Sequence, residues 1–148
     1  ARIVVYFTFI DKRLEEDTFA LGDLPLCKVL LMNVSDFPWI IVVPRLPNII
    51  EIFDLSTSQQ ENYRKEITYM ASKMSKLYTS DKMNIASLGN IVSQFHTHII
   101  ARYKDDAAWP KPVWSLKSMK KYKKEDSIIE IDKLKRLVDD YHWGENNE

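Results

Sequence analysis

The feature that most constrains the fold of this chain is a long segment without a helix breaker. No glycine or proline occurs between Ser56 and Gly89, and the polar side chains of Ser56 and Gln59 suit the start of a helix. Apolar side chains then recur at steps of three and four residues, at Tyr63, Ile67, Met70, Met74 and Leu77. The spacing predicts one amphipathic helix over residues 57–78, and its apolar face needs a second layer to cover.

The second layer is predicted to be a sheet, because β-rich runs lie on both sides of this helix. Turn-forming residues separate the runs at 27–32 and 39–43, and Pro44 closes the second run, as is typical of an antiparallel hairpin. Strands are predicted at residues 17–21, 27–32, 39–43, 82–87 and 95–103, with a turn at Gly89-Asn90, an extended stretch at 109–114 and a second amphipathic helix at 126–142. The fold class is therefore α+β: an antiparallel sheet of about five strands, one long helix packed on it, and a C-terminal helical extension.

Length and composition favour one cytoplasmic domain. A chain of 148 residues can bury a core without staples. Its 21 basic residues balance 21 acidic ones, so no net field selects nucleic acid or a membrane surface as a partner. The apolar runs are too short to cross a bilayer. The single cysteine, Cys27, cannot form an internal disulfide, which suits a reducing compartment.

The most informative segment is Gln94-Phe95-His96-Thr97-His98. On a strand the side chains alternate, so Gln94, His96 and His98 are predicted to share one face while the long helix covers the other. Imidazole has an ordinary pKa of about 6.5, which leaves it mostly neutral and nucleophilic near pH 7. Such a face suits an anion such as phosphate.

Two other interpretations of the histidine pair stay open on spacing alone. The two rings could form a solvent-facing polar edge with no chemistry. A His-x-His pair can also hold zinc, but zinc would need a third ligand, and His142 in the tail is the only other histidine. We expect no metal.

The chain resembles the histidine triad (HIT) superfamily, whose signature is His-φ-His-φ-His-φ-φ, with φ an apolar residue. The signature positions are occupied here by Gln94, His96, His98, Ile99 and Ile100, so glutamine replaces the first histidine. Residues 39–44 match the family's His-φ-φ-φ-φ-Pro strand, with Trp39 in the histidine's place. The segments 21–27 and 105–110 are similar to a bacterial subgroup of HIT-domain proteins.

The resemblance implies a site and a mechanism. His96 would attack the α-phosphorus of a nucleotide with its opposite ring nitrogen held by a backbone carbonyl, and His98 would donate to the phosphate oxygens. Catalytic positions are thus expected at His96, His98 and Gln94. Nucleotide-binding positions are expected at Leu31 (base), Asn33 (ribose), Asn84, Gly89 and Asn90 (phosphate), Arg102 and Trp109. No metal or cofactor is implied. Without the resemblance, the asparagines would be interpreted as turn residues, Arg102 as a solvated strand end and Trp109 as packing.

The predicted function is hydrolysis or nucleotidyl transfer at the α-phosphate of a dinucleoside polyphosphate or phosphoramidate. The alternative is a catalytically weak purine nucleotide-binding protein, because Gln94 cannot carry a proton to a leaving group. Residues 1–114 are expected to form the nucleotide-binding domain and 115–148 a helical extension of the same unit. The basic segment 117–124 also fits a nucleic-acid binder, but acidic residues follow it directly and favour a structural role for the tail. The resemblance implies a homodimer.

Overall fold

The computed structural model describes residues 9–141 and contains one five-stranded antiparallel sheet, as predicted. The strand order is β1-β2-β3-β5-β4, and every neighbouring pair is antiparallel. The strands are β1 (Thr18–Asp23), β2 (Cys27–Met32), β3 (Trp39–Pro44), β4 (Lys82–Ala86) and β5 (Thr97–Arg102). β1 and β4 are therefore the two edges of the sheet.

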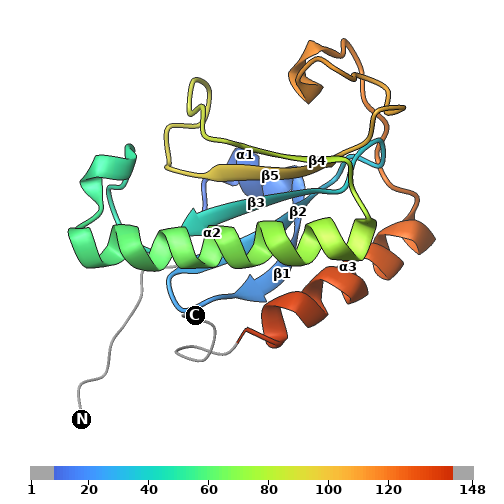
Figure 1. The fold of residues 1–148 in the computed structure, drawn as a ribbon. Helices are drawn as coiled ribbons and strands as arrows, with labels where there is room; N and C mark the ends of the chain where they lie inside the picture. Colours follow the sequence, from blue (N-terminus) through green and yellow to red (C-terminus); the bar gives the residue numbers. More distant parts are fainter. Residues whose placement is uncertain (1–8, 142–148) are drawn as a thin grey trace.

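Helices cover the two faces unequally (Figure 1). The long helix α2 (Thr57–Tyr78) and the C-terminal helix α3 (Lys124–Asp139) pack on one face, whereas the short helix α1 (Lys12–Glu16) lies on the other. α2 begins with a capping box, in which Ser56 and Gln59 each accept a hydrogen bond from the other's backbone N–H. The α+β class is confirmed.

Alternation along the strands sends apolar side chains into two separate cores. On the α2 side, Leu31, Ile40 and Ile99 pack with Met70 and Met74 of the helix. On the other side a second cluster surrounds Trp39, with Leu30, Ile41, Ile100, Phe37 and Val113. The sheet is thus the middle layer, and β5 sends alternate side chains to each core.

The element boundaries agree with the sequence analysis for α2 and β2 and differ elsewhere. β5 begins at Thr97, so the strand predicted from Phe95 was wrong at its N-terminal end. β1 continues past its predicted end at Leu21 to Asp23. Its register with β2 shifts between Ala20 and Gly22, and Gly22 has a φ of +138° at this bulge. Helix α1 was not predicted. The stretch predicted to be extended ends in a 3₁₀ turn (Val113–Ser115). Between β4 and β5 the chain forms a loop over residues 87–96, where the sequence analysis predicted a turn at Gly89-Asn90.

The C-terminal helix belongs to the same core as α2. Leu134 and Val138 are buried in the cluster on the α2 side, and Tyr69 of α2 donates a hydrogen bond to the carbonyl of Leu137. The predicted end of this helix, His142, lies outside the described residues. None of the helices in residues 9–141 is long and apolar enough to cross a membrane.

Candidate functional site

The two histidines lie together at the start of β5, on the face opposite α2. Their ring centroids are 5.0 Å apart and both side chains are mostly buried. His98 is the register partner of Ile41, a member of the second core, which fixes the face to which it points. Thr97, between them, points the other way and hydrogen-bonds with Tyr63 of α2. The alternation predicted for these residues is therefore present.

His96 is held by its own chain. Its Nδ1 atom lies 2.7 Å from the carbonyl oxygen of Gln94, so the ring donates a hydrogen from Nδ1 and keeps the lone pair on Nε2. A backbone carbonyl was the partner expected for this nitrogen. Among residues 9–141 no protein group hydrogen-bonds to Nε2 of either histidine.

His98 is held by an indole. The Nε1–H of Trp39 donates to Nδ1 of His98 at 3.0 Å, and Trp114 stands edge-on to the same ring with centroids 5.0 Å apart. Burial, with a contribution from neighbouring His96, lowers the pKa of His98 to about 4. His98 is therefore neutral at physiological pH, with its proton on Nε2.

Gln94 does not stand in a row with the histidines. It precedes the strand, and both polar atoms of its side-chain amide bind the N-terminal segment. Its Oε1 accepts from the backbone N–H of Asp11 at 2.7 Å, and its Nε2 donates to the carbonyl of Phe9 at 2.7 Å. Asp11 in turn caps α1. Gln94 thereby ties the entry of α1 to the loop before β5.

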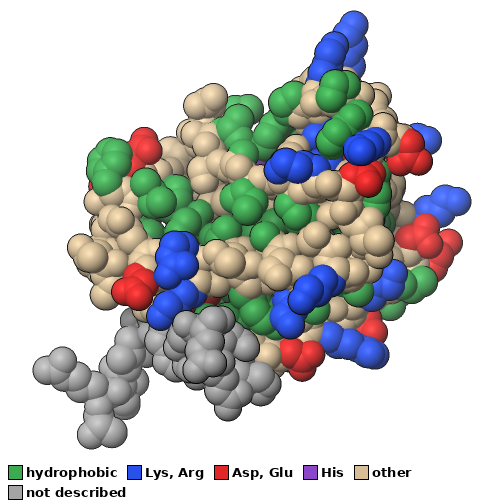
Figure 2. All heavy atoms as spheres, viewed as in Figure 1, with side chains coloured by type: hydrophobic (Ala, Val, Ile, Leu, Met, Phe, Trp, Pro, Cys, Tyr) green, Lys and Arg blue, Asp and Glu red, His purple; other side chains and the backbone are tan. Residues whose placement is uncertain are grey.

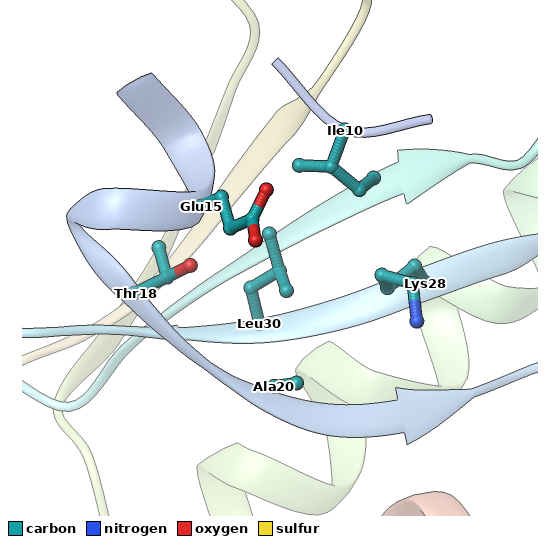
Figure 3. Close-up of a pocket in the computed structure, with 6 residues that line it drawn as sticks. All are labelled: Ile10, Glu15, Thr18, Ala20, Lys28 and Leu30. Carbon is teal, nitrogen blue, oxygen red and sulfur yellow. The ribbon is translucent and has the colours of Figure 1, made fainter. Parts of the chain in front are cut away.

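A cavity of about 290 Å³ lies under α1 on the histidine face of the sheet (Figure 3). Its lining combines apolar and polar side chains from α1, β1 and β2: Ile10, Glu15, Thr18, Ala20, Lys28 and Leu30. Leu30 pairs with Ile41, and Ile41 pairs with His98, so the cavity and the histidine lie two strands apart on one face. Strand spacing makes that separation on the order of 10 Å.

The structure does not bring Leu31 or Asn33 to the histidines. Leu31 is fully buried on the α2 side, because side chains alternate and its neighbour Leu30 takes the histidine face. The side-chain oxygen of Asn33 accepts the backbone N–H of Tyr122 at 3.0 Å and fastens the C-terminal segment to the sheet.

Arg102, Asn84 and Trp109 form a network at the far end of β5. Arg102 is almost fully buried and makes a two-pronged ion pair with Asp106 at 2.7 and 3.0 Å. It also donates to Asn84 Oδ1 at 2.8 Å and lies 5.7 Å from the ring centroid of Trp109. Burial alone would raise the pKa of Asp106, but hydrogen bonds from Arg102 and from three backbone N–H groups hold it at about 2. These contacts organise the segment after β5.

Gly89 and Asn90 lie in the loop between β4 and β5. Gly89 has a φ of +75°, which favours glycine, and Asn90 is exposed. The loop is anchored at its start by Ser87, whose hydroxyl lies 2.7 Å from that of Thr97. It then leads directly to His96.

Three residues of this region escaped the sequence analysis. Trp39 was noted only as the residue in the histidine's place of the family pattern, yet it is the hydrogen-bond partner of His98. Asp106 follows Arg102 at i+4, a spacing that signals an ion pair only on a helix. Trp114 gave no signal, because its contact with His98 depends on how the chain turns back after β5.

No metal centre is formed by the described part of the chain. Within residues 9–141 no group of three or more His, Cys, Asp or Glu side chains lies close enough to hold an ion. The third zinc ligand considered from the sequence, His142, lies outside that range.

The α+β fold and the two neighbouring imidazole rings at the start of a central strand are the features of a histidine triad protein. The chain belongs to the HIT domain family: the model of that family matches residues 13–105. No curated protein sequence matches the chain.

Solved structures of bacterial proteins agree with this assignment. A histidine triad protein from Marinobacter aquaeolei is 41% identical, covers 91% of this chain and 98% of its own, and has a TM-score of 0.86. One from Bradyrhizobium japonicum is 40% identical, covers 90% and 99%, and has a TM-score of 0.85. Diadenosine triphosphate hydrolase from Plasmodium falciparum, 18% identical over 93% and 87% with a TM-score of 0.62, shares the fold.

Proposed function

We propose that this protein is a nucleotide hydrolase or nucleotidyl transferase that acts at the α-phosphate of a dinucleoside polyphosphate or nucleoside phosphoramidate. The observation that carries the proposal is the hydrogen bond from His96 Nδ1 to the carbonyl of Gln94, which leaves a lone pair on Nε2. Membership of the HIT family and the fold shared with a diadenosine triphosphate hydrolase support the substrate class.

In the proposed reaction, the Nε2 lone pair of His96 forms a bond to the α-phosphorus. The bond from phosphorus to the leaving group breaks, and the leaving group departs with that electron pair and takes a proton from solvent. Water or another acceptor then attacks phosphorus and releases a proton to solvent, while the P–N bond breaks and its electron pair returns to Nε2 of His96. The Nε2–H of His98 donates to the phosphate oxygens while charge accumulates on them.

The cavity under α1 is the proposed seat of the base. It lies on the face of His98 at a separation on the order of 10 Å, which a nucleoside can bridge. Glu15 and Lys28 offer an acceptor and a donor to the base or ribose, and Leu30 offers an apolar contact. In this proposal Leu30 takes the part that the resemblance implied for Leu31.

The alternative, a nucleotide-binding protein with slow turnover, is favoured by the position of Gln94. Both polar atoms of its amide are bound to backbone groups, and an amide does not give up a proton as an acid does, so Gln94 cannot protonate a leaving group. Removal of a general acid costs roughly 10²–10⁴-fold in rate, and leaving groups that depart without help are therefore the expected substrates.

The test is His96→Ala against a panel of adenosine and guanosine phosphoramidates and dinucleoside polyphosphates. Release of nucleoside monophosphate should fall by at least about 10³-fold while circular dichroism and the melting temperature stay close to those of the parent. Mass spectrometry should detect a nucleotidyl adduct on His96 in the parent protein alone. Turnover that survives in His96→Ala would exclude the mechanism, and tight binding without turnover in the parent would leave the binding protein.

We further propose a homodimer formed along β4 and α2. Ile85 is half exposed on the α2 side of edge strand β4, and Leu88 and Ile91 in the loop after β4 are exposed as well. Figure 2 shows apolar side chains gathered above α2. A groove of about 590 Å³ runs beside the first half of α2. Ile85→Glu should lower the mass measured by light scattering to that of a monomer. Ile128→Glu, which changes an exposed side chain of α3, should not. An unchanged mass in Ile85→Glu would remove this interface.

The remaining proposals concern domain extent and location. Residues 1–114 are proposed to form the nucleotide-binding domain, with 115–148 as an extension of the same unit, since α3 shares the core of α2. A cytoplasmic location is proposed because Cys27 is a buried, free thiol.

A further inference from the structure

Trp39 occupies an unusual place for a tryptophan. It is the first residue of β3, is 1% exposed, and shares the face of His98 through its register partner Ile100. Its ring stands edge-on to His98, with centroids 5.6 Å apart. The indole N–H is thus buried, and His98 Nδ1 at 3.0 Å is its partner. A buried indole N–H needs such an acceptor.

This contact fixes the tautomer of His98. An indole nitrogen donates and never accepts, so Nδ1 of His98 has to present a lone pair. The proton of the neutral ring is then on Nε2. Protonation of Nδ1 would place two N–H groups against each other in a buried site, which disfavours the imidazolium. A histidine at position 39, as the family pattern has, could either donate or accept and would leave the tautomer undetermined.

Among the described residues, no charged group near His98 fixes its tautomer in place of Trp39. From β3 it faces Trp39 and Ile41, from β4 its register partner is Ala86, and from the segment after β5 it meets Trp114. The titratable group beside it is His96, 5.0 Å away. Burial and His96 both lower the pKa of His98, to about 4.

We propose that Trp39 is a positioning residue: its indole N–H locks His98 as the Nε2–H tautomer, so that the two histidines present opposite atoms to the phosphate. His96, whose Nδ1–H is bound to Gln94, offers a lone pair at Nε2, while His98 offers a hydrogen at Nε2. One ring can then attack phosphorus while the other stabilises its oxygens. This assignment of roles rests on the proposed function, but the tautomer does not.

The experiment is ¹⁵N NMR of the imidazole rings in the ligand-free full chain, titrated from pH 4 to pH 8. In the parent protein His98 should be wholly in the Nε2–H form above about pH 5. Trp39→Phe keeps an aromatic ring but loses the donor, so His98 should become a mixture of tautomers and its pKa should rise by at least about one unit toward 6.5. Trp114→Phe changes a second ring that stands edge-on to His98 and also to Trp39, but it removes no hydrogen bond to Nδ1. It is the matched control and should leave the tautomer unchanged.

The outcomes separate this inference from the proposed function. An Nδ1–H signal for His98 in the parent would overturn the inference without any variant, even if Trp39→Phe did not fold. An unchanged tautomer and pKa in folded Trp39→Phe would overturn it as well. If the NMR result holds but no substrate in the panel turns over, the proposed function fails and the positioning role stands. If turnover is found, Trp39→Phe should add a second titrating group to the pH profile of kcat/KM between about pH 5 and 7.

Discussion

The two faces of the sheet are made by alternate residues of the same strands, yet they are filled in opposite ways. The face under α2 is a continuous apolar core, with Glu66 as its buried charge. The face under α1 carries His98, Trp39 and Arg102 among its apolar neighbours. Because neighbouring residues of a strand point to opposite faces, the apolar core and the face that carries the histidines are built from alternate residues of the same strands.

Polar groups on the histidine face are tied down one by one. Arg102 is bound to Asp106, Asn84 and the carbonyl of Lys111, and each histidine has its Nδ1 engaged. Within residues 9–141 no protein group hydrogen-bonds to the Nε2 atom of either histidine. Substitutions on the α2 face should thus change stability alone, while those on the histidine face should change chemistry, stability or both according to the partner lost.

The largest effect is expected where a buried charge loses its partner. Arg102→Met should lower the free energy of unfolding by about 3–5 kcal/mol, because Asp106 is left buried without its cation. Denaturant unfolding measures the change. Arg136→Met, which breaks an exposed pair with Asp132, is the control and should cost at most about 1 kcal/mol. Equal losses in the two variants would show that burial does not set the strength of the pair.

On the α2 face the next effect should be purely one of packing. Met74 is completely buried, and Met74→Ala should cost about 2–5 kcal/mol in the free energy of unfolding. Below the melting temperature, kcat/KM should stay within about twofold of the parent value. Lys76→Ala, exposed on the same helix, should change neither quantity. A large fall in kcat/KM for Met74→Ala would mean that the two faces are coupled.

The faces also respond to pH with opposite signs. Burial raises the pKa of Glu66 from 4.5 to about 7, against the hydrogen bonds from the N–H groups of Cys27 and Leu26. A raised carboxyl pKa stabilises the fold below pH 4.5, and this stabilisation is lost as the pH rises through 7. His98, with its pKa lowered from 6.5 to about 4, stabilises the fold above pH 6.5 and loses this contribution as the pH falls through 4.

These two contributions should nearly cancel in the parent protein. Each is about 3 kcal/mol at most, so the free energy of unfolding should change by less than about 1 kcal/mol between pH 5 and pH 7.5. Glu66→Gln should gain about 2 kcal/mol over that rise in pH, and His98→Gln should lose about as much. Unfolding curves at the two pH values test the signs. Parallel slopes in both variants would contradict the opposition.

Periodicity in the sequence was sufficient to predict the structure of the α2 face but not that of the histidine face. α2 was predicted from Thr57 to Tyr78 because its cap and its apolar stripe are local signals. α1 was missed because five residues are too few to show a period. Leu31 was named from a resemblance, which places a segment near a ligand but does not say which face of the sheet each residue takes. The register of Leu30 with Ile41 puts Leu30, and not Leu31, on the histidine face.

Long-range hydrogen bonds account for the other differences. The pairing of Trp39 with His98 spans 59 positions, and that of Gln94 with Asp11 spans 83. No spacing rule reaches across such distances, so Gln94 was placed by the strand period, which does not extend back beyond Thr97. Its amide instead supports the segment that leads into α1.

Substitution of Gln94 gives the smallest expected effect, but it separates a role in substrate binding from a role in the chemical step. Its two hydrogen bonds hold residues 9 and 11, and Ile10 between them lines the cavity under α1. Gln94→Ala should therefore loosen the cavity and raise KM about tenfold, the equivalent of about 1.4 kcal/mol, with kcat within about threefold. Gln94→Glu keeps the acceptor for Asp11 but loses the donor to Phe9, so its KM should lie between that of the parent protein and that of Gln94→Ala. A loss confined to kcat would instead mean that Gln94 contributes a hydrogen bond in the chemical step, and the histidine face would then hold one more chemical group than its hydrogen bonds suggest.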